Sequence, residues 1–225
     1  MVGLKRWMRK RTKYVKYAAE LDIYHFYESL KPEIVINRLN QLIKDEKIIE
    51  LVKVLIKDKI PIGTYYSQWF ANMVLTPLDH YIREQLKVKY YLRYMDNLTL
   101  LGPNKKKMHK AVKAISEYLQ TLGLKLKSNW QVFKISARPI KALGYRYGKN
   151  YTLLKKENLL RTKRKLSKFY KDFKKEKISY KSAAGLISRL GMLKHCKSRA
   201  IKQKYVYRGT EKALKFIVKF GSLKI

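Results

Sequence analysis

The chain has 225 residues, with 53 Lys and Arg against 16 Asp and Glu, which gives a formal net charge of +37, and 46% of its residues are hydrophobic. An apolar supply of this size can bury a core, so an unstructured basic tail is excluded. A globular chain this cationic predicts a polyanionic partner, with nucleic acid favoured over an acidic membrane surface.

The sequence also limits where the protein works. It has no run of about 18 apolar residues, which a membrane-spanning helix needs. The basic start, from Lys5 to Lys16, leads to Glu20 and Asp22 rather than to the apolar segment of a signal peptide. Because Cys196 is the only cysteine, an internal disulfide is excluded. We therefore expect a reducing, cytoplasmic setting and no membrane partner.

The first half of the chain passes from a basic start to apolar helical patterns. The start predicts a short helix or an arm lying on nucleic acid, and the apolar stretch after it predicts a strand that carries the carboxylate of Asp22. A break over 59–64 then leaves Ser67 as the N-cap of a long apolar helix. The expected elements are an arm over 1–16, a strand over 18–24, and helices over 32–43, about 48–56 and about 67–86.

The second half opens with the clearest local signal in the chain. Two β-prone runs, 90–95 and 98–102, flank the turn-prone pair Asp96-Asn97 and predict a β-hairpin. A helix follows, with apolar residues at helical spacing from Met108 to Leu122. Shorter strand-like pieces are expected at 124–126, 130–135, 142–147 and 151–154.

The composition changes again at Lys155. Between Lys155 and Lys204 there are eighteen Lys and Arg and three acids, in helical patterns broken near Ser179 and Gly191. We therefore expect a basic N-terminal arm (1–16), a mixed α/β body (17–154) and a basic helical region (155–225).

Two carboxylates stand out because each interrupts an apolar strand pattern. Asp22 ends the first predicted strand, and Asp96 lies at the hairpin turn. A carboxylate in such a place costs burial energy unless a positive group compensates it. If both strands share one sheet, the two side chains meet at one edge and suit Mg²⁺, as in two-metal phosphoryl transfer on a polyanion. A turn residue at Asp96 and a strand-end cap at Asp22 are the structural alternatives.

The order of the motifs resembles motifs A to E in the palm of reverse transcriptases, and the resemblance covers nearly the whole chain. It runs from a strand ending in Asp, through a Gly loop with Ser opening a helix and an aromatic-x-Asp hairpin, to a Lys-rich strand and a Leu-Gly-Tyr segment. The five segments are Leu21–Tyr27 (A), Ile62–Gln68 (B), Tyr94–Asn97 (C), Gly123–Lys127 (D) and Leu143–Tyr147 (E).

Motif B narrows the resemblance. Most reverse transcriptases have Gln before the Gly and Pro after the Ser, whereas this chain has Ile62 and Gln68. This form is similar to the reverse transcriptases of diversity-generating retroelements of bacteria and their phages. Those enzymes copy a template-repeat RNA into cDNA, misincorporate opposite adenines and bind an accessory variability protein. The segments 130–133 and 191–195 also look like that family, and the group II intron and retron enzymes rank second.

The resemblance implies a role for each matching position. Asp22, Asp96 and Asn97 would be catalytic, and Asp22, Asp96 and the Ile23 carbonyl would hold two Mg²⁺ ions. Tyr27 would exclude a ribose 2′-OH. The other implied roles are a nucleotide and template pocket at Ile62, Gly63 and Gln68, pyrophosphate neutralisation by Lys125 or Lys127, a primer grip at Leu143, Gly144 and Tyr145, and phosphate contacts by Lys163, Arg164, Lys168 and Lys171.

The chain departs from the family pattern in two places. Motif C ends in Asn97 where the family usually has a second Asp, so we expect weaker metal binding, with inactivation as the alternative. Only 21 residues precede Asp22, so the fingers region that family members have before motif A is expected to be missing.

The sequence therefore predicts an α+β fold, with a reverse-transcriptase palm of antiparallel sheet and packed helices followed by a basic helical thumb. The expected activity is RNA-directed DNA polymerisation of the diversity-generating type, in a bacterial or phage-encoded cytoplasmic protein. The expected partners are an RNA template, a DNA or RNA primer, dNTPs and an accessory variability protein. The alternatives are a non-catalytic nucleic-acid-binding remnant, a group II intron or retron enzyme, and a structural subunit that completes another polypeptide's polymerase.

Overall fold

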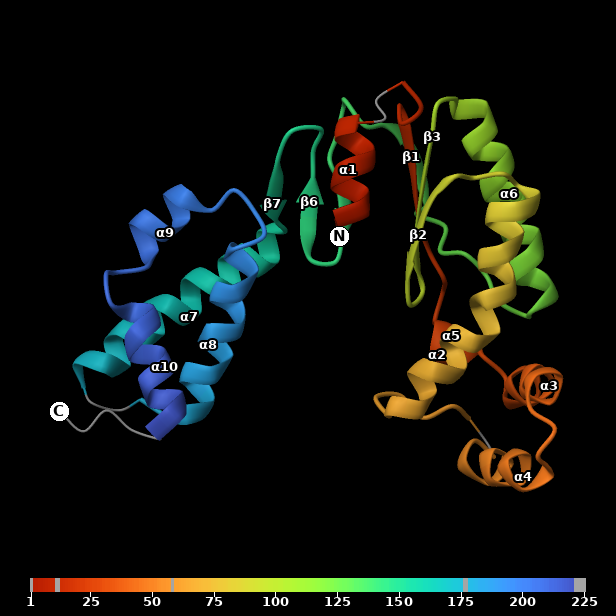
Figure 1. Ribbon diagram of the computed structural model, residues 1–225, viewed down its shortest axis with the longest axis horizontal. Coiled ribbons are helices and arrows are strands. Elements are labelled where there is room, and N and C mark those ends of the chain that lie inside the picture. Colours follow the sequence, from red (N-terminus) through yellow and green to blue (C-terminus); the bar gives the residue numbers. More distant parts are fainter. Residues whose placement is uncertain (1, 11–12, 58, 176–177, 221–225) are drawn as a thin grey trace. The chain divides into compact units, whose positions relative to one another are not determined.

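The computed structural model describes residues 2–10, 13–57, 59–175 and 178–220. The chain folds into two compact units, a first unit over 1–138 and a second unit over 139–225 (Figure 1). Each unit combines an antiparallel sheet with packed helices, which confirms the predicted α+β class.

An antiparallel sheet forms the centre of the first unit. Its strands are β1 (Tyr17–Asp22), β2 (Tyr90–Tyr94), β3 (Asn97–Gly102) and β4 (Gln131–Lys134), in the order β2-β3-β1-β4. Apolar and aromatic runs form these strands because such side chains pack well on a half-buried pleated surface. The register pairs Tyr17 with Gly102 at one end of β1 and Asp22 with Asn97 at the other. Asp22 therefore ends its strand beside the β2–β3 hairpin.

Two long helices lie on the same side of this sheet (Figure 1). α5 (Tyr65–His80) continues into a π-helical turn, η1 (Tyr81–Gln85), and α6 (Lys105–Thr121) follows the hairpin. The apolar spacing predicted for α6 becomes its buried face, which packs into the main core. The buried residues of α6 are Met108, Ala111, Val112, Ile115 and Leu119.

The start of α5 differs from the prediction. Thr64 is the N-cap, and Ser67 lies inside the helix, fully buried, with its hydroxyl 2.6 Å from that of Thr64. Ser67 as the N-cap is therefore wrong. Gly63, at a φ of 91°, supplies the left-handed turn directly before Thr64, so the helix begins earlier.

The N-terminal segment packs on the first unit as a helix. α1 spans Val2–Lys10, with Leu4 and Met8 buried and the Trp7 ring 5.6 Å from that of Tyr90. Apolar side chains at helical spacing thus hold residues 2–10 on protein, rather than leaving them as an extended arm. Residues 11 and 12 of the predicted arm lie outside the described residues.

Short helices connect β1 to α5. They are α2 (Phe26–Ser29), α3 (Pro32–Leu42) and α4 (Glu46–Leu55). Pro32 takes the first helical position of α3, as predicted, because its missing N–H has no acceptor there. Asp45 caps α4 by accepting a hydrogen bond from the Lys47 N–H at 2.9 Å.

The second unit joins a small antiparallel sheet to the basic helices. The strands are β5 (Ile140–Ala142), β6 (Tyr145–Tyr147) and β7 (Thr152–Leu154), and the helices are α7 (Lys156–Lys174), α8 (Tyr180–Leu193), α9 (Arg199–Tyr205) and α10 (Thr210–Phe220). The small sheet folds with the helices, so the compact units divide at 138/139, whereas the composition changes at Lys155. The helical pattern breaks at Ser179 as predicted, and Ser179 caps α8, which passes Gly191 and ends at Leu193.

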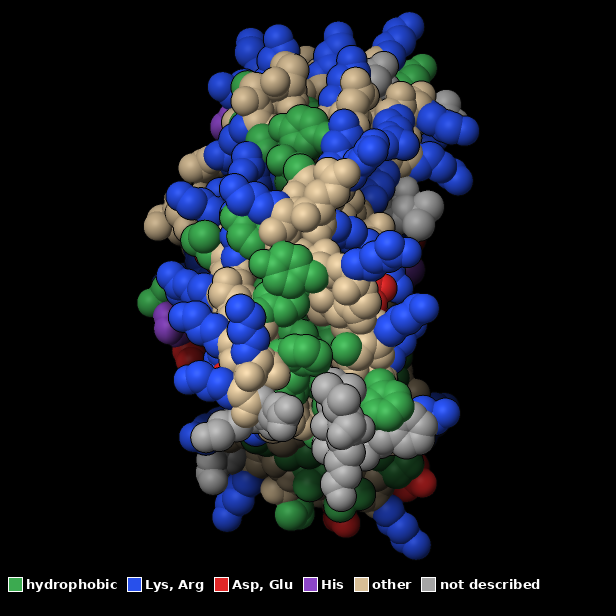
Figure 2. Space-filling model, turned by 90° about the vertical axis from the view of Figure 1, so that its left-hand side faces the viewer, with side chains coloured by type: hydrophobic (Ala, Val, Ile, Leu, Met, Phe, Trp, Pro, Cys, Tyr) green, Lys and Arg blue, Asp and Glu red, His purple; other side chains and the backbone are tan. Residues whose placement is uncertain are grey.

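These basic helices are amphipathic. α7 buries Thr162, Leu166 and Phe169 and exposes Lys and Arg on its other side. On the face that includes these helices, Lys and Arg side chains surround a band of hydrophobic and aromatic ones (Figure 2). In the part of the chain that the structure describes, no helix has the length and apolar character needed to cross a membrane.

Candidate active site

The structure brings Asp22 and Asp96 together at one edge of the first unit's sheet. Asp22 is the last residue of β1, and Asp96 directly precedes β3, the neighbouring strand. The backbone N–H of Ile23 donates to the Asp96 carbonyl at 3.1 Å, which ties the two strand ends together. Both aspartates are partly exposed as residues, but the Oδ1 atom of Asp22 is itself buried.

The hairpin that carries Asp96 turns one residue earlier than predicted. Tyr94 pairs with Asn97, so the turn residues are Met95 and Asp96, and Asn97 begins β3. Met95 has a φ of 55°, a left-handed conformation in which glycine is usually favoured in such turns. The Asn97 side chain donates from Nδ2 to Asp96 Oδ1 at 2.8 Å, so it orients that carboxylate without adding charge.

Lys127 is the lysine that contacts the carboxylates. Its Nζ lies 2.7 Å from Asp22 Oδ1, and its backbone N–H donates to the Asp22 carbonyl at 2.8 Å. The hydrogen bond to Asp22 is the main cause of a raised pKa at Lys127, and the charge of Asp96 adds to it. Lys125 has an exposed side chain, and its carbonyl accepts a hydrogen bond from the Tyr24 N–H at 2.8 Å.

Tyr27 reaches the same turn from α2. Its hydroxyl lies 4.0 Å from Met95 Sδ, and the ring is half-buried. Burial, and then the negative charge of Asp96, raise the pKa of the Tyr27 hydroxyl, so it stays protonated at neutral pH. The aromatic residue expected beside the nucleotide therefore lies next to the aspartate at the turn.

A partly buried cation, Arg93, is the part of the site that the sequence analysis missed. Arg93 donates to both carboxylate oxygens of Asp79, at 2.8 and 2.6 Å, and to Asn72 Oδ1 at 2.8 Å. It also donates to the Met95 carbonyl at 3.3 Å, and Tyr91 donates to Asp79 at 2.7 Å. Burial and the Asp79 charge raise the pKa of Tyr91. This network ties α5 to the turn next to Asp96.

The sequence does contain a signal for this network. Arg93 is a lone basic residue in an aromatic strand pattern, and Asp79 is a lone acid in an apolar helix. Two such positions predict an ion pair, because removing a charged side chain from water without a partner destabilises the fold.

The motif B residues lie at the start of α5. Ile62 is exposed, and Gly63 and Gln68 frame the first turn of the helix. Gln68 and Asn72 are four residues apart and so lie on one face of α5. Asn72 contacts Met95 at 4.0 Å, which places Gln68 one turn along the face that meets the hairpin turn.

The predicted primer-grip residues belong to the second unit. Leu143 and Gly144, with φ of 50° and 81°, form the tight turn between β5 and β6. The Gly144 carbonyl accepts from Asn158 Nδ2 at 3.2 Å, and a Cβ at this glycine would lie only 2.7 Å from that atom. The Tyr145 hydroxyl donates to the Met192 carbonyl at 3.1 Å, so the hairpin is fixed to α7 and α8.

The predicted phosphate contacts do not form one row. Arg164, Lys168 and Lys171 are exposed on one side of α7 at helical spacing. Lys163 instead lies over the Tyr205 ring, with Nζ 4.7 Å from its centroid. Lys163 therefore points to a different side of α7 from the other three, because consecutive residues of a helix point in different directions. Phosphate contacts by all four residues stay a prediction.

The donor set at the sheet edge fits a divalent cation. Asp22 and Asp96 supply two carboxylates, and Mg²⁺ typically takes one or two. In an antiparallel pair, the N–H and C=O of one residue point to the same neighbouring strand. Because the Ile23 N–H donates to Asp96, the Ile23 carbonyl also faces the strand end that carries Asp96. Within the described ranges, no group of three or more His, Cys, Asp or Glu is suited to hold a metal. One of the two carboxylates, Asp22, is already paired with Lys127.

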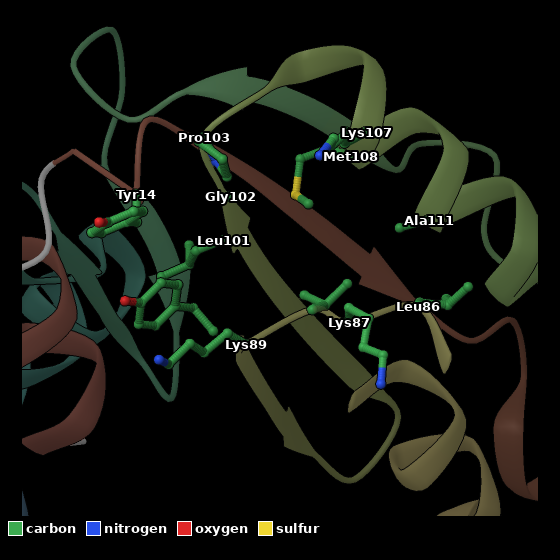
Figure 3. A pocket seen from close by; sticks show the side chains of 12 residues that line it. Tyr14, Leu86, Lys87, Lys89, Leu101, Gly102, Pro103, Lys107, Met108 and Ala111 are labelled. Carbon is green, nitrogen blue, oxygen red and sulfur yellow. The ribbon is translucent and has the colours of Figure 1, made fainter. Parts of the chain in front are cut away.

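A pocket of about 470 Å³ at the other end of the sheet is separate from this site (Figure 3). Its lining includes Leu101, Gly102 and Met108, and Gly102 pairs with Tyr17. Asp22 is five residues along β1 from Tyr17, roughly 17 Å at the usual rise of a strand. The described lining contains no carboxylate, so this pocket does not share the chemistry of Asp22 and Asp96.

Comparison with protein families identifies the same family that the order of the sequence motifs resembles. The family described as reverse transcriptase (RNA-dependent DNA polymerase) matches residues 4–147, well over half of the chain. A search of the curated proteins finds no match.

The fold is similar to solved structures of telomerase from Candida tropicalis. The apo telomerase gives a TM-score of 0.59 at 14% identity, over 96% of this chain and 47% of that chain. Telomerase in complex with the TWJ fragment of telomeric RNA gives 0.56 at 14% identity, over 98% and 46%. The apo form truncated from the C-terminal domain gives 0.54 at 16% identity, over 68% and 38%. The chain thus spans less than half of each telomerase chain, and at these identities the likeness shows the fold alone.

Proposed function

The chain belongs to the reverse transcriptase (RNA-dependent DNA polymerase) family, and from this premise we propose that it extends a DNA or RNA primer with dNTPs along an RNA template. The observation that supports this most is the placement of Asp22 and Asp96 at one sheet edge, joined by the Ile23–Asp96 hydrogen bond of 3.1 Å. The second unit, with 26 Lys and Arg against 4 acids, would hold the template–primer duplex.

Two Mg²⁺ ions are the proposed cofactors. Asp22, Asp96 and the Ile23 carbonyl would hold them, with Asn97 beside them as a neutral amide. When bound, such ions polarise the α-phosphate and the primer hydroxyl and neutralise the charge on the leaving pyrophosphate. Because Lys127 already contacts Asp22 at 2.7 Å, the ammonium group has to share or leave this carboxylate when a cation binds.

The proposed reaction is nucleotidyl transfer. The primer 3′-oxygen forms a bond to the α-phosphorus of the dNTP, the bond from that phosphorus to the bridging oxygen breaks, and pyrophosphate leaves while the hydroxyl proton is released. Lys127, which stays protonated beside Asp22, would donate hydrogen bonds to the pyrophosphate oxygens. Tyr27, held near Met95, would lie against the sugar and exclude a 2′-hydroxyl.

The diversity-generating type is the finer proposal, and it rests on motif B. Ile62 is 67% exposed at the start of α5, where an apolar side chain removes a polar contact that would discriminate base pairs. We expect Ile62→Gln to lower misincorporation opposite template adenines. An accessory variability protein would be a further partner. Unchanged error rates in a sequencing assay of the cDNA would contradict this assignment.

One observation favours a second candidate, a nucleic-acid-binding protein without turnover. Asn97 occupies the place of the family's second Asp, and Lys127 pairs with one of the two remaining carboxylates. Both features lower the negative charge available to metals.

Primer extension on an RNA template with Mg²⁺ and dNTPs separates the two candidates. The polymerase proposal predicts extension by the wild type and by Glu50→Ala, which removes an exposed carboxylate of α4, and no extension by Asp96→Ala. If neither the wild type nor Asn97→Asp extends a template–primer that both bind, the protein is the non-catalytic binder.

A further inference from the structure

We propose that the turn between α9 and α10 is a stacking platform for an unpaired base, so that the second unit binds single-stranded nucleic acid at Tyr207. The platform consists of Tyr170 on α7 and Tyr207 in the turn, with Tyr205 beside them. It lies in the second unit and is independent of nucleotidyl transfer at Asp22 and Asp96.

Hydrogen bonds of one hydroxyl hold the turn in place. The Tyr170 hydroxyl donates to the Tyr205 carbonyl at 3.1 Å, accepts from the Tyr207 N–H at 3.0 Å and lies 2.9 Å from Thr210 Oγ1. One donated and two accepted bonds use the full capacity of a phenol. Gly209, at a φ of 88°, lets the chain enter α10 directly after the turn. The loop is therefore fixed before any ligand arrives.

The Tyr207 ring is supported on one side and open on the other. Its centroid lies 4.4 Å from that of Tyr170, with the planes tilted by 39°. Its side chain nevertheless remains 63% exposed. A rigid aromatic ring with one covered and one open face is the arrangement on which bases of single strands stack.

Cations surround the platform. Lys163 lies over the Tyr205 ring at 4.7 Å, Lys204 lies 5.9 Å from the same ring, and Arg208 follows Tyr207 on the exposed turn. Figure 2 shows such a pattern on a larger scale, with hydrophobic and aromatic side chains surrounded by Lys and Arg. Residues 139–225 contain only 4 acids, so this unit attracts a polyanion. The open Tyr207 ring favours a polyanion that has exposed aromatic bases.

An unpaired base fits this surface better than a duplex does. In a duplex, neighbouring base pairs cover both faces of each base, and only phosphates and groove edges reach the protein. Lysines alone would bind the phosphates of a duplex and of a single strand equally well. A tyrosine ring with one open face adds contact area only when it meets an unpaired base. The ligand class is therefore single-stranded RNA or DNA, bound by stacking and by phosphate contacts.

Fluorescence anisotropy with the full chain tests the platform. The probes are a labelled oligo(dT) of about twelve nucleotides and a labelled hairpin duplex of equal phosphate number, at about 0.15 M salt. We expect Tyr207→Ala to weaken oligo(dT) binding about tenfold, a typical loss for one stacked base, and duplex binding less than about twofold. The slope of log K against log salt stays the same, because the lost contact carries no charge.

The controls separate stacking from folding. Tyr207→Phe keeps the ring and should bind like the wild type, and Tyr180→Ala removes another exposed tyrosine of the same unit, at the start of α8, without effect. Equal weakening of single-strand and duplex binding by Tyr207→Ala would overturn the proposal, as would no weakening at all. Poly-glutamate of equal charge serves as a competitor. If it displaces oligo(dT) from the wild type but not from Tyr207→Ala, the proposal is overturned in favour of an acidic protein partner. Primer extension is not part of the readout, so a failed polymerase proposal leaves this test intact.

Discussion

The two units of the molecule handle charge in opposite ways. The first unit has 27 Lys and Arg against 12 acids, and the second has 26 against 4 in a shorter stretch of chain. The ion pairs in which both partners are described, Arg93–Asp79 and Lys127–Asp22 among them, all lie in the first unit. In the second unit the described contacts of Lys163 and Lys204 are with an aromatic ring.

The cations therefore have different roles in the two units: they position side chains in the first and attract a polyanion in the second. In the first unit, a few acids fix particular cations, and those contacts place the turn that carries Asp96. In the second unit, the cations lack enough internal acids, so their compensation has to come from an external polyanion. The same residue types therefore organise a site in one unit and form a binding surface in the other.

The largest effect on nucleic-acid affinity should follow from removing the exposed cations of α7. We expect the triple substitution of Arg164, Lys168 and Lys171 by Ser to lower the salt slope of duplex binding by about 2.7, at about 0.9 per phosphate contact, and to weaken binding at about 0.1 M salt by roughly two orders of magnitude. Titrations against salt measure this. Substitution of Lys105, Lys106 and Lys110, which are exposed on α6, is the matched control. An equal loss in both triple variants would contradict the assignment of binding to the second unit.

A substitution at Arg93 tests the first unit, in which cations are paired with acids of the same unit. Arg93→Met leaves Asp79, 25% exposed, without its cation, and we expect the free energy of unfolding to fall by about 2–4 kcal/mol. Denaturant unfolding measures the loss. Arg138→Met breaks the more exposed pair with Glu20 and should cost about 1 kcal/mol or less. If Arg93→Met is as stable as the wild type, the network does not hold the turn.

The smallest expected effects concern metal affinity at the sheet edge. Asn97→Asp adds a carboxylate beside Asp96, so Mn²⁺ should bind about tenfold more tightly. Lys127→Met removes the cation that competes for Asp22, and should tighten binding by up to about fivefold, the equivalent of about 1 kcal/mol for a partly exposed pair. Calorimetry measures both, and Lys125→Met should leave the affinity unchanged. Weaker binding in Lys127→Met would mean that the lysine supports the site rather than competing for it.

The sequence predicts the elements and the position of the carboxylates well, because both depend on local patterns. The apolar spacing of α6 and the β-prone runs around Asp96 are local, and they predict the helix and the hairpin that the structure contains. The turn itself is shifted by one residue, and Met95 has a left-handed conformation that local preference disfavours. Arg93, which is bound to Asp79 of α5, donates to the Met95 carbonyl, and Asn72 of α5 contacts Met95 Sδ, so long-range contacts support this conformation.

The contacts within the site could not be predicted, since they join residues that are far apart in the chain. Local sequence leaves Lys125 and Lys127 equivalent, and only the pairing of this segment with β1 places Lys127 on Asp22. Lys163 likewise turns to the Tyr205 ring because the α9–α10 turn lies beside α7.

Single-turnover nucleotide addition at saturating template–primer concentration tests the separation of the two units most directly. We expect Asp96→Asn to stay at least about a thousandfold below the wild-type rate however much template–primer is added, because the defect lies in nucleotidyl transfer. The Arg164, Lys168 and Lys171 triple variant should regain the wild-type rate once saturated, because its defect lies in binding. A triple variant that stays slow at saturation, or an Asp96→Asn variant that is restored by excess template–primer, would contradict this account.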